Sequence, residues 1–131
     1  MVSALAYCHH DLKLLHRDLK PANIFLDAQG RVKIGDFGMS RLLKDPLNNT
    51  QTYTLTANIG SPSYMAPELL NPMTSATRYS SSVDVYAFGI MLHTMTLRLP
   101  PYREQDYKGV LQLLQAVQQG VQLEVEGEHC C

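Results

Sequence analysis

Apolar side chains recur every three or four positions over the first twelve residues of the chain. The positions of this stripe, one of them a histidine, are Val2, Leu5, Ala6, His9 and Leu12. This spacing matches the turn of an α-helix and predicts an amphipathic helix over residues 1–12. No capping side chain precedes it, so we expect the helix to begin abruptly, as if the chain started inside a longer element.

Two short apolar runs, Ile24–Leu26 and Val32–Ile34, lie on either side of the sequence Asp-Ala-Gln-Gly. Runs of this kind joined by a four-residue turn that ends in glycine predict a β-hairpin. The turn would be centred at Ala28 and Gln29, so the residues just outside the two strands should leave the hairpin at the same end.

The second half of the chain alternates between loops and helices. Residues 39–62 are rich in Thr, Asn and Ser and lack apolar periodicity, which predicts a long loop of the kind that is usually functional. The serines at 80–82 could cap a helix over 83–97, which is apolar nearly all round and therefore expected to be buried. A further helix is predicted over 108–119, with Gly120 as its stop.

Composition narrows the class of protein. The chain has 131 residues, of which 45% are hydrophobic and 18% charged, as expected for one soluble globular domain or part of one. Its net charge of -1 argues against a broad nucleic-acid or membrane surface. The longest apolar run, Val85–Leu92, is too short to span a bilayer.

The location of the protein is predicted from its cysteines and its first residues. There are three cysteines, Cys8, Cys130 and Cys131, and this sparse, odd count favours a reducing compartment over a disulfide scaffold. The first residues carry no basic region of the kind that begins a signal peptide. We therefore expect a cytoplasmic protein.

The stretch Leu15–Gly38 carries more polar side chains than a packed domain needs. The acids, bases and amide that interrupt its apolar pattern are His16, Arg17, Asp18, Lys20, Asn23 and Asp36. Asn23 and Asp36 flank the predicted hairpin, so an amide oxygen and a carboxylate should converge at its open end. These ligand types suit Mg²⁺, which takes few protein ligands and keeps several waters.

Asp18 and Lys20 lie on the loop that leads into the first strand, within reach of whatever such a cation would hold. A base, a cation and two metal ligands at one edge describe a phosphoryl-transfer centre, where the protein positions groups and neutralises charge. The alternative is a solvated cluster of turn residues, which the order of the motifs below disfavours.

Other polar groups have simpler interpretations. His9 and His10 could suggest a metal site, but adjacent residues on a helix face apart, so surface or core packing is favoured. His129 and the two terminal cysteines could bind metal or be lipidated, but a loose tail is favoured without further ligands. The threonines at 50, 52, 54 and 56 could belong to an ordinary polar loop.

Three motifs in fixed order resemble the eukaryotic protein kinase catalytic domain. They are HRDLKPAN, DFG and GSPSYMAPE, followed by DVYAFG, and the resemblance covers residues 4–120. It implies an α+β, mainly helical fold: a fragment of the kinase C-terminal lobe with a small β-hairpin at the catalytic edge. The whole chain, 1–131, would be a partial kinase domain without its N-lobe and terminal helices.

The resemblance implies that ATP and Mg²⁺ are the cofactors, and it assigns roles around them. Asp18 would be the catalytic base and Lys20 would contact the transferring γ-phosphate. Asn23 and Asp36 would bind Mg²⁺, Asp36 the ion that bridges the phosphates. Phe25 would form a floor under the adenine ring, although it could also be an ordinary core residue.

The same resemblance implies structural roles. His16 and Phe37 would stack in the internal hydrophobic column of the active state. Asp84 would accept hydrogen bonds from the backbone of the catalytic loop. Glu68 would pair with an arginine from a later part of the domain, and Ser61 would bond to the catalytic loop beside the acceptor pocket.

Lys20 and Ser61 resemble the residues of serine/threonine kinases, so the expected partner is a protein substrate with a Ser or Thr acceptor. The sequence SSSVDVYAFGIMLHTM resembles the tyrosine-kinase-like group within that class. Regulation is expected from Arg17 and Arg41, which could grip a phosphate on one of two loop threonines. The candidates for that phosphate are Thr56 and then Thr54.

Several parts of a kinase are missing from these 131 residues. The sequence contains no Gly-rich phosphate loop, no strand lysine with its partner glutamate, and no hinge. We therefore expect the isolated chain to be inactive, with catalysis belonging to a longer parent protein. The alternative is a non-catalytic, kinase-like binding or regulatory module.

Overall fold

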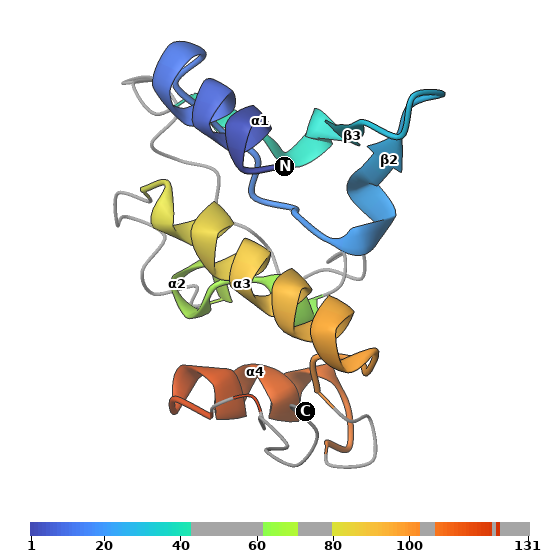
Figure 1. The fold of residues 1–131 in the computed structure, drawn as a ribbon. Helices are drawn as coiled ribbons and strands as arrows, with labels where there is room; N and C mark the ends of the chain where they lie inside the picture. Colours follow the sequence, from blue (N-terminus) through green and yellow to red (C-terminus); the bar gives the residue numbers. More distant parts are fainter. Residues whose placement is uncertain (43–61, 71–79, 103–106, 122, 124–131) are drawn as a thin grey trace.

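The computed structural model describes residues 1–42, 62–70, 80–102, 107–121 and 123. Helix α3 (Ser82–Leu97) crosses the middle of the molecule in Figure 1. Helix α1 (Val2–Ala6) and the hairpin of β2 (Ile24–Leu26) and β3 (Val32–Ile34) lie on one side of it, and helix α4 (Val110–Gln118) lies on the other. The described part thus combines helices with two antiparallel strand pairs, in agreement with the predicted mixed, mainly helical class.

The first helix begins as α1 (Val2–Ala6) and continues as a π-helical turn over Tyr7–Asp11. The N–H of Leu12 donates to the carbonyl of Tyr7, five residues back, at 3.1 Å. No side chain caps the start at Met1, as predicted. The helix over 1–12 is therefore confirmed, but periodicity alone did not predict the wider π turn, a feature that is frequent at functional sites.

Strands β2 (Ile24–Leu26) and β3 (Val32–Ile34) form the predicted hairpin, with Phe25 opposite Lys33. Its turn is fixed by Asp27, whose Oδ1 accepts hydrogen bonds from two backbone N–H groups of the turn. Gly30 has a φ of +74°, a conformation that glycine adopts without strain.

A second strand pair was not predicted. Strand β1 (Leu14–Leu15) pairs with β4 (Arg41–Leu42), and Leu15 lies opposite Arg41. Each strand has only two residues, too few for a period of two to stand out in the sequence. The predicted loop over 39–62 is therefore wrong at this edge, and its central residues, 43–61, lie outside the described part.

The central helix differs from prediction in two ways. Ser81 occupies the N-cap position but makes no side-chain cap bond; Ser80 Oγ instead accepts from the N–H of Ser82 at 3.2 Å. The helix is also less buried than its composition predicts. It buries Val83, Asp84, Ala87, Ile90 and Met91, while Val85, Leu92 and Met95 are exposed.

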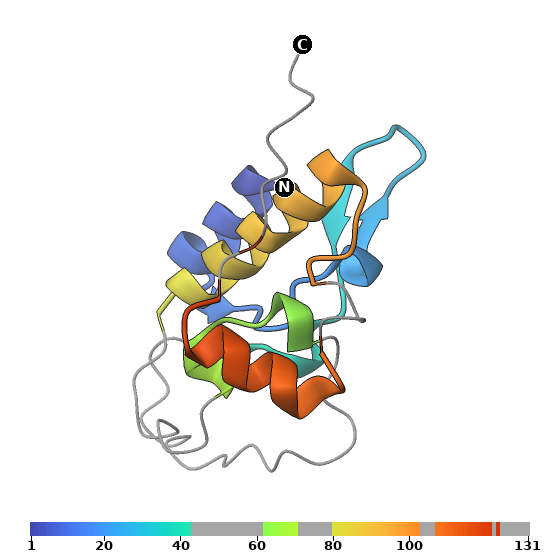
Figure 2. The same cartoon turned by 90° about the horizontal axis from the view of Figure 1, so that it is seen from below.

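Two apolar clusters lie on the two sides of α3. Leu5 and Leu19 pack with Ala87 and Met91 between α3 and the side of α1. On the other side a cluster forms under α4, and Figure 2 shows α4 lying across the short helix α2 (Pro67–Leu70). The buried members of this second cluster are Met65, Leu113, Leu114 and Val117, with Tyr102 and Tyr107 packed against them.

Helix α4 ends as predicted. Gly120 has a φ of +86°, and its N–H and that of Val121 donate to carbonyls in the last turn of the helix. In the described part of the chain, no helix combines the length and the apolar character needed to cross a membrane.

Candidate active site

A buried carboxylate organises the site. Asp84, at the start of α3, is 0% exposed. Its Oδ1 accepts from the backbone N–H of Arg17 at 2.8 Å, and its Oδ2 accepts from the N–H of His16 at 2.9 Å. Oδ2 also accepts from Nε2 of His9 at 2.7 Å. These three donors satisfy a charge that would otherwise be costly to bury.

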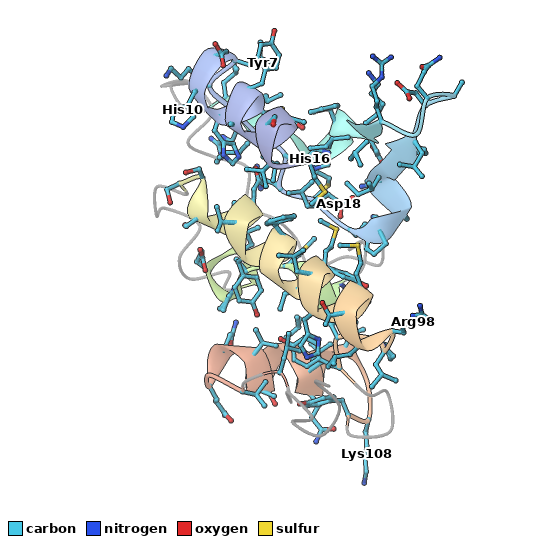
Figure 3. The ribbon with its side chains drawn as sticks, viewed as in Figure 1. Tyr7, His10, His16, Asp18, Arg98 and Lys108 are labelled. Carbon is cyan, nitrogen blue, oxygen red and sulfur yellow. The ribbon has the colours of Figure 1, made fainter. Side chains whose placement is uncertain are left out.

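His9 owes its position to the π-helical turn that contains it. His10, the next residue, is exposed, and in Figure 3 it points away from the molecule. The two histidines therefore face apart as predicted, and no group of three or more His, Cys, Asp or Glu in the described part could hold a metal. Burial, together with the negative charge of Asp84, raises the pKa of the neighbouring Cys8 thiol.

His16 uses both ring nitrogens. The N–H of Asp18 donates to Nδ1 at 3.3 Å, while Nε2 donates to the carbonyl of Gly35 at 2.9 Å. This pattern requires the tautomer that carries its hydrogen on Nε2. The ring also lies 4.9 Å, centroid to centroid, from the ring of Phe37. Figure 3 shows His16 between α1 and the hairpin, and its bond to Gly35 joins the hairpin to the loop that contains Asp18.

Asp18, Lys20 and Asn23 come together at the foot of the hairpin. Asp18 Oδ2 accepts from Nζ of Lys20 at 2.8 Å and from Nδ2 of Asn23 at 3.1 Å. Nδ2 of Asn23 also donates to the backbone carbonyl of Asp18 at 2.8 Å. Asp18 Oδ1 has no hydrogen bond within the described residues. Within the described residues, one carboxylate oxygen is thus held in place by two donors and the other accepts no hydrogen bond.

The two ends of the hairpin meet as expected. The N–H of Gly35 donates to the carbonyl of Asn23 at 2.9 Å, which brings the residue before Asp36 against Asn23. Asp36 is exposed and accepts from the N–H of Gly38 at 3.3 Å.

The donor set suits the implied Mg²⁺. Among the described residues, both hydrogen bonds of the Asn23 side chain use Nδ2, and its amide oxygen accepts none. Asp36 adds an exposed carboxylate. An amide oxygen and a carboxylate are the hard ligands that Mg²⁺ takes.

The backbone is strained beside this site. Arg17 and Asp36 adopt φ values of +68° and +59°, in the left-handed region that non-glycine residues seldom occupy. Such conformations cost about 1–3 kcal/mol each and gather at active sites, where surrounding contacts hold them. Here the N–H of Arg17 is held by Asp84, and the carbonyl of Gly35, next to Asp36, is held by His16.

Phe25 is 52% exposed on the hairpin, so within the described residues it is not buried in the core. Its ring covers Gly35, at which an added Cβ would lie 2.7 Å from Cε2 of the ring. The sequence did not predict that Gly35 and His9 contact the site, Gly35 through Asn23 and His16 and His9 through Asp84. The signal for Gly35 was a glycine directly before DFG.

The remaining predicted residues lie farther from this centre or outside the description. Arg17 is buried, and the pairing of Leu15 with Arg41 brings β4 beside the loop that contains it. Glu68 is half-buried in the first turn of α2 and takes part in an interaction. Ser61, Thr54 and Thr56 lie outside the described residues.

Comparison with known proteins identifies the family. The model of the protein kinase domain matches residues 1–129. The chain is 34% identical over 113 residues to a CDC5 homolog, a cell cycle serine/threonine-protein kinase of Encephalitozoon cuniculi, which covers 86% of this chain and 22% of that protein. It is 38% identical over 103 residues to the human serine/threonine-protein kinase Nek2, with 76% and 21% covered.

The serine/threonine-protein kinase YPK1 of Saccharomyces cerevisiae is 39% identical over 107 residues, which cover 79% of this chain and 14% of that protein. The chain thus spans between 14% and 22% of the length of these three relatives. The match of the family model over nearly the whole chain confirms the resemblance drawn from the three motifs. This chain belongs to the protein kinase family.

Proposed function

We propose that the protein containing this chain transfers phosphate from ATP to Ser or Thr residues of protein substrates. The observation that carries the proposal is the Lys20–Asp18–Asn23 cluster, in which one buried carboxylate oxygen is fixed by two donors and the other accepts no hydrogen bond from the described part of the chain. The names of the relatives support the same class of reaction. The chain would be part of the C-terminal lobe.

In this reaction Asp18 is the base. The hydroxyl of the acceptor Ser or Thr donates a hydrogen bond to Oδ1 of Asp18, and its oxygen forms a bond to the γ-phosphorus of ATP. The bond from that phosphorus to the β,γ-bridging oxygen breaks, ADP leaves, and the hydroxyl proton passes to Asp18. Lys20, 2.8 Å from Asp18, supplies positive charge beside the transferring group.

Asn23 and Asp36 would hold Mg²⁺, whose charge neutralises the phosphate oxygens of the nucleotide. The contribution of this chain is to fix the two ligands. Asn23 is held through Nδ2, and the backbone before Asp36 is tied to Asn23 and His16. Phe25 offers an exposed aromatic face to the adenine.

The acceptor type is tested by phosphoamino-acid analysis of a generic substrate labelled by the full-length protein. Lys20 in the loop, together with Ser61 in its motif, supports phosphoserine and phosphothreonine as the products. Mainly phosphotyrosine would refute this part of the proposal. Assignment to the tyrosine-kinase-like group rests on the motif at 80–95 and stays a prediction.

Roles of the two aspartates are tested by Asp18→Asn and Asp36→Asn in the full-length protein. Asp18→Asn should lower kcat by about 100-fold or more while ATP still binds, because loss of a general base costs about that much. Asp36→Asn should weaken binding of Mg²⁺-ATP and also abolish turnover, and both variants should keep the fold. The matched control is Asp11→Asn at the exposed end of the π turn. Near wild-type kcat in either variant would remove that residue from the mechanism.

A regulatory switch is part of the proposal. Arg41 lies in β4 opposite Leu15, and Arg17 follows Leu15 by two residues, so the two arginines come from neighbouring segments. A phosphate on Thr56 or Thr54 could therefore be bound by both cations. The double variant Thr54→Ala/Thr56→Ala should fail to gain activity when the protein is incubated with ATP. Full activation of that variant would place the switch elsewhere.

The isolated 131 residues are proposed to bind no ATP at micromolar strength, because the sequence holds no Gly-rich loop and no strand lysine to complete the cleft. Calorimetry with Mg²⁺-ATP tests this, and micromolar binding would contradict it. The alternative, a non-catalytic binding module, would be favoured if the full-length protein bound nucleotide but transferred no phosphate even with Asp18 and Asp36 intact.

A further inference from the structure

Arg98 is an exposed cation held in a backbone conformation that costs free energy. It is the residue at which α3 ends, with φ +55° and ψ +30°, in the left-handed region. Glycine is the usual residue in this conformation after a helix, because it lacks the Cβ that makes the conformation costly. In Figure 3 the Arg98 side chain extends outward from the end of α3, and within the described ranges no salt bridge or hydrogen bond joins its guanidinium to another residue. A strained residue that keeps an unpaired charge indicates a role outside the fold itself.

The catalytic loop runs along α3 toward Arg98. The backbone N–H of Arg17 is bonded to Asp84 in the first turn of α3, and Leu19 packs with Met91 farther along the helix. Arg98 follows Met91 by seven positions, which is two turns or about 10 Å along the helix axis. The end of α3 therefore lies beyond the loop, in the direction in which the loop runs.

The hairpin and the turn Pro62–Tyr64 reach the same half of α3. Ile24, Ile34 and Tyr64 all pack against the cluster that contains Met91. In both Figure 1 and Figure 2, the C-terminal end of α3, drawn in orange, lies near the foot of the hairpin. The proposed base, the hairpin foot and the end of α3 are thus neighbours. A protein segment whose hydroxyl reaches the base passes close to the exposed cation.

We propose that Arg98 is a specificity-determining residue of the acceptor site, and that it selects protein segments with an Asp or Glu side chain near the Ser or Thr acceptor. This inference rests on the proposed function and adds the class of substrate, an acidic segment. A guanidinium can bind a carboxylate through two parallel N–H···O hydrogen bonds. Because this pair forms at the surface, the preference should be modest and should weaken as salt is added.

The structural alternative is that Arg98 only offsets the negative end of the α3 dipole. The last turn of α3 contains no basic residue, so a cation directly after it is favourable. That role would change the stability of the protein but not its choice of peptide. Measuring both quantities separates the two explanations.

The test uses the full-length protein and a set of peptides with a single Ser acceptor, in which one Glu is moved stepwise to either side of the serine. Each peptide is compared with its Gln counterpart. At one or more positions, wild type should prefer Glu by about threefold to fivefold in kcat/KM, the upper range for an exposed ion pair. Arg98→Gly should lose this preference through KM for the peptide, with KM for ATP unchanged. Arg98→Glu should invert it, so that Lys is preferred at the same position.

The matched control is Lys13→Gly. Lys13 is also exposed and left-handed, with φ +52°, and it follows the π turn whose His9 contacts Asp84 at the opposite end of α3. Both glycine variants remove one positive charge and one left-handed residue with a Cβ, so net charge and backbone strain change alike. Only Arg98→Gly should change the choice of peptide.

Three outcomes would overturn the inference. Wild type could show no preference for Glu at any position, Arg98→Gly could keep the preference, or Lys13→Gly could lose it to the same extent. Phosphate transfer to Ser that does not depend on Glu would leave the proposed function intact and remove the role of Arg98.

Failure of the proposed function looks different. Peptides with Ala in place of the acceptor measure binding without transfer. A wild-type protein that bound the Glu form of such a peptide more tightly than the Gln form, through Arg98, but transferred no phosphate to the Ser peptides would refute the reaction and leave the selection intact.

Discussion

The two sides of α3 are built on opposite principles. On the side of α1, the buried groups include a set of polar ones: His16, Arg17, Asp18, Asn23 and Asp84. They are held by directed hydrogen bonds between 2.7 and 3.3 Å. On the side of α4, the buried cluster is apolar and is stabilised by removal of apolar surface from water. Its members are Met65, Leu113, Leu114 and Val117.

This difference teaches where the molecule needs precision. A hydrogen bond has one geometry, and a buried polar atom that loses its partner costs more than the bond contributed. An apolar contact accepts a neighbour of similar volume with little loss. The polar side therefore holds Arg17 and Asp36 in strained backbone conformations, whereas the apolar side keeps the helices together.

The largest effect is expected from Asp84→Asn. The amide keeps the size of the side chain but turns one of its two acceptor oxygens into a donor, which then faces an N–H group of His9, His16 or Arg17. We expect the free energy of unfolding to fall by about 3–5 kcal/mol, as for breaking a buried charged pair, and activity to be lost. Denaturant titration of the full-length protein measures this, with the exposed Asp11→Asn as control. A cost below about 1 kcal/mol would mean that Asp84 does not organise the loop.

Leu114→Ala is the corresponding change on the apolar side. Leu114 lies in α4 and is 5% exposed, so the cavity left by the substitution should lower the free energy of unfolding by about 2–5 kcal/mol. KM for ATP should not change in the protein that remains folded, because the cluster contains none of the predicted site residues. Leu114→Met, of similar volume, should cost less than about 1.5 kcal/mol. Equal losses in the two variants would show that this side also requires precise shape.

Tyr86→Phe tests a single polar contact on the largely apolar side. The hydroxyl of Tyr86 in α3 lies 3.3 Å from that of Tyr102, next to the cluster under α4. Burial, and then the bond to Tyr86, raises the pKa of Tyr102, so its hydroxyl stays neutral. A long bond between neutral groups should contribute about 0.5–1 kcal/mol. A double-mutant cycle with Tyr102→Phe measures the coupling, and zero coupling would mean that the hydroxyls contribute separately.

The same contrast explains what the sequence could predict. Periodicity predicted the first helix and α4, and two short apolar runs around a turn predicted the hairpin. Burial follows these patterns only in part: Val2 and Leu12 of the first stripe are exposed, and the hairpin strands are exposed or half-buried. Motifs predicted that Asp18, Lys20 and Asn23 would gather at one edge, and the hydrogen bonds bring them together there.

Features that depend on contacts between distant residues were missed. The β1–β4 pair is too short to have a pattern, and its partners are far apart in sequence: Leu15 and Arg41 differ by 26 positions and Leu14 and Leu42 by 28. The bond from His9 to Asp84 joins residues 75 apart and depends on the π turn. The exposed side of α3 could not be read from a helix that is apolar nearly all round.

The smallest effect is expected at the hairpin turn, far from both buried clusters. The pKa of Asp27 is lowered, first by the backbone N–H of Arg31 that its carboxylate accepts and then by the side chain of Arg31, with Lys33 adding at 3.7 Å. Since the folded pKa lies below the unfolded value of 3.8, the charge stabilises the fold above that pH and the contribution disappears as the pH falls through the folded pKa. Asp27→Asn keeps the acceptor for the turn but removes the charge. The variant should be slightly less stable than wild type at pH 7, and the two unfolding midpoints should converge in acid below pH 3.8. Because the pair is exposed, salt should shrink the difference at pH 7. A difference that persisted in acid would mean that the turn depends on the carboxyl group itself, and the hairpin would then resemble the polar side of α3 in its demand for one exact side chain.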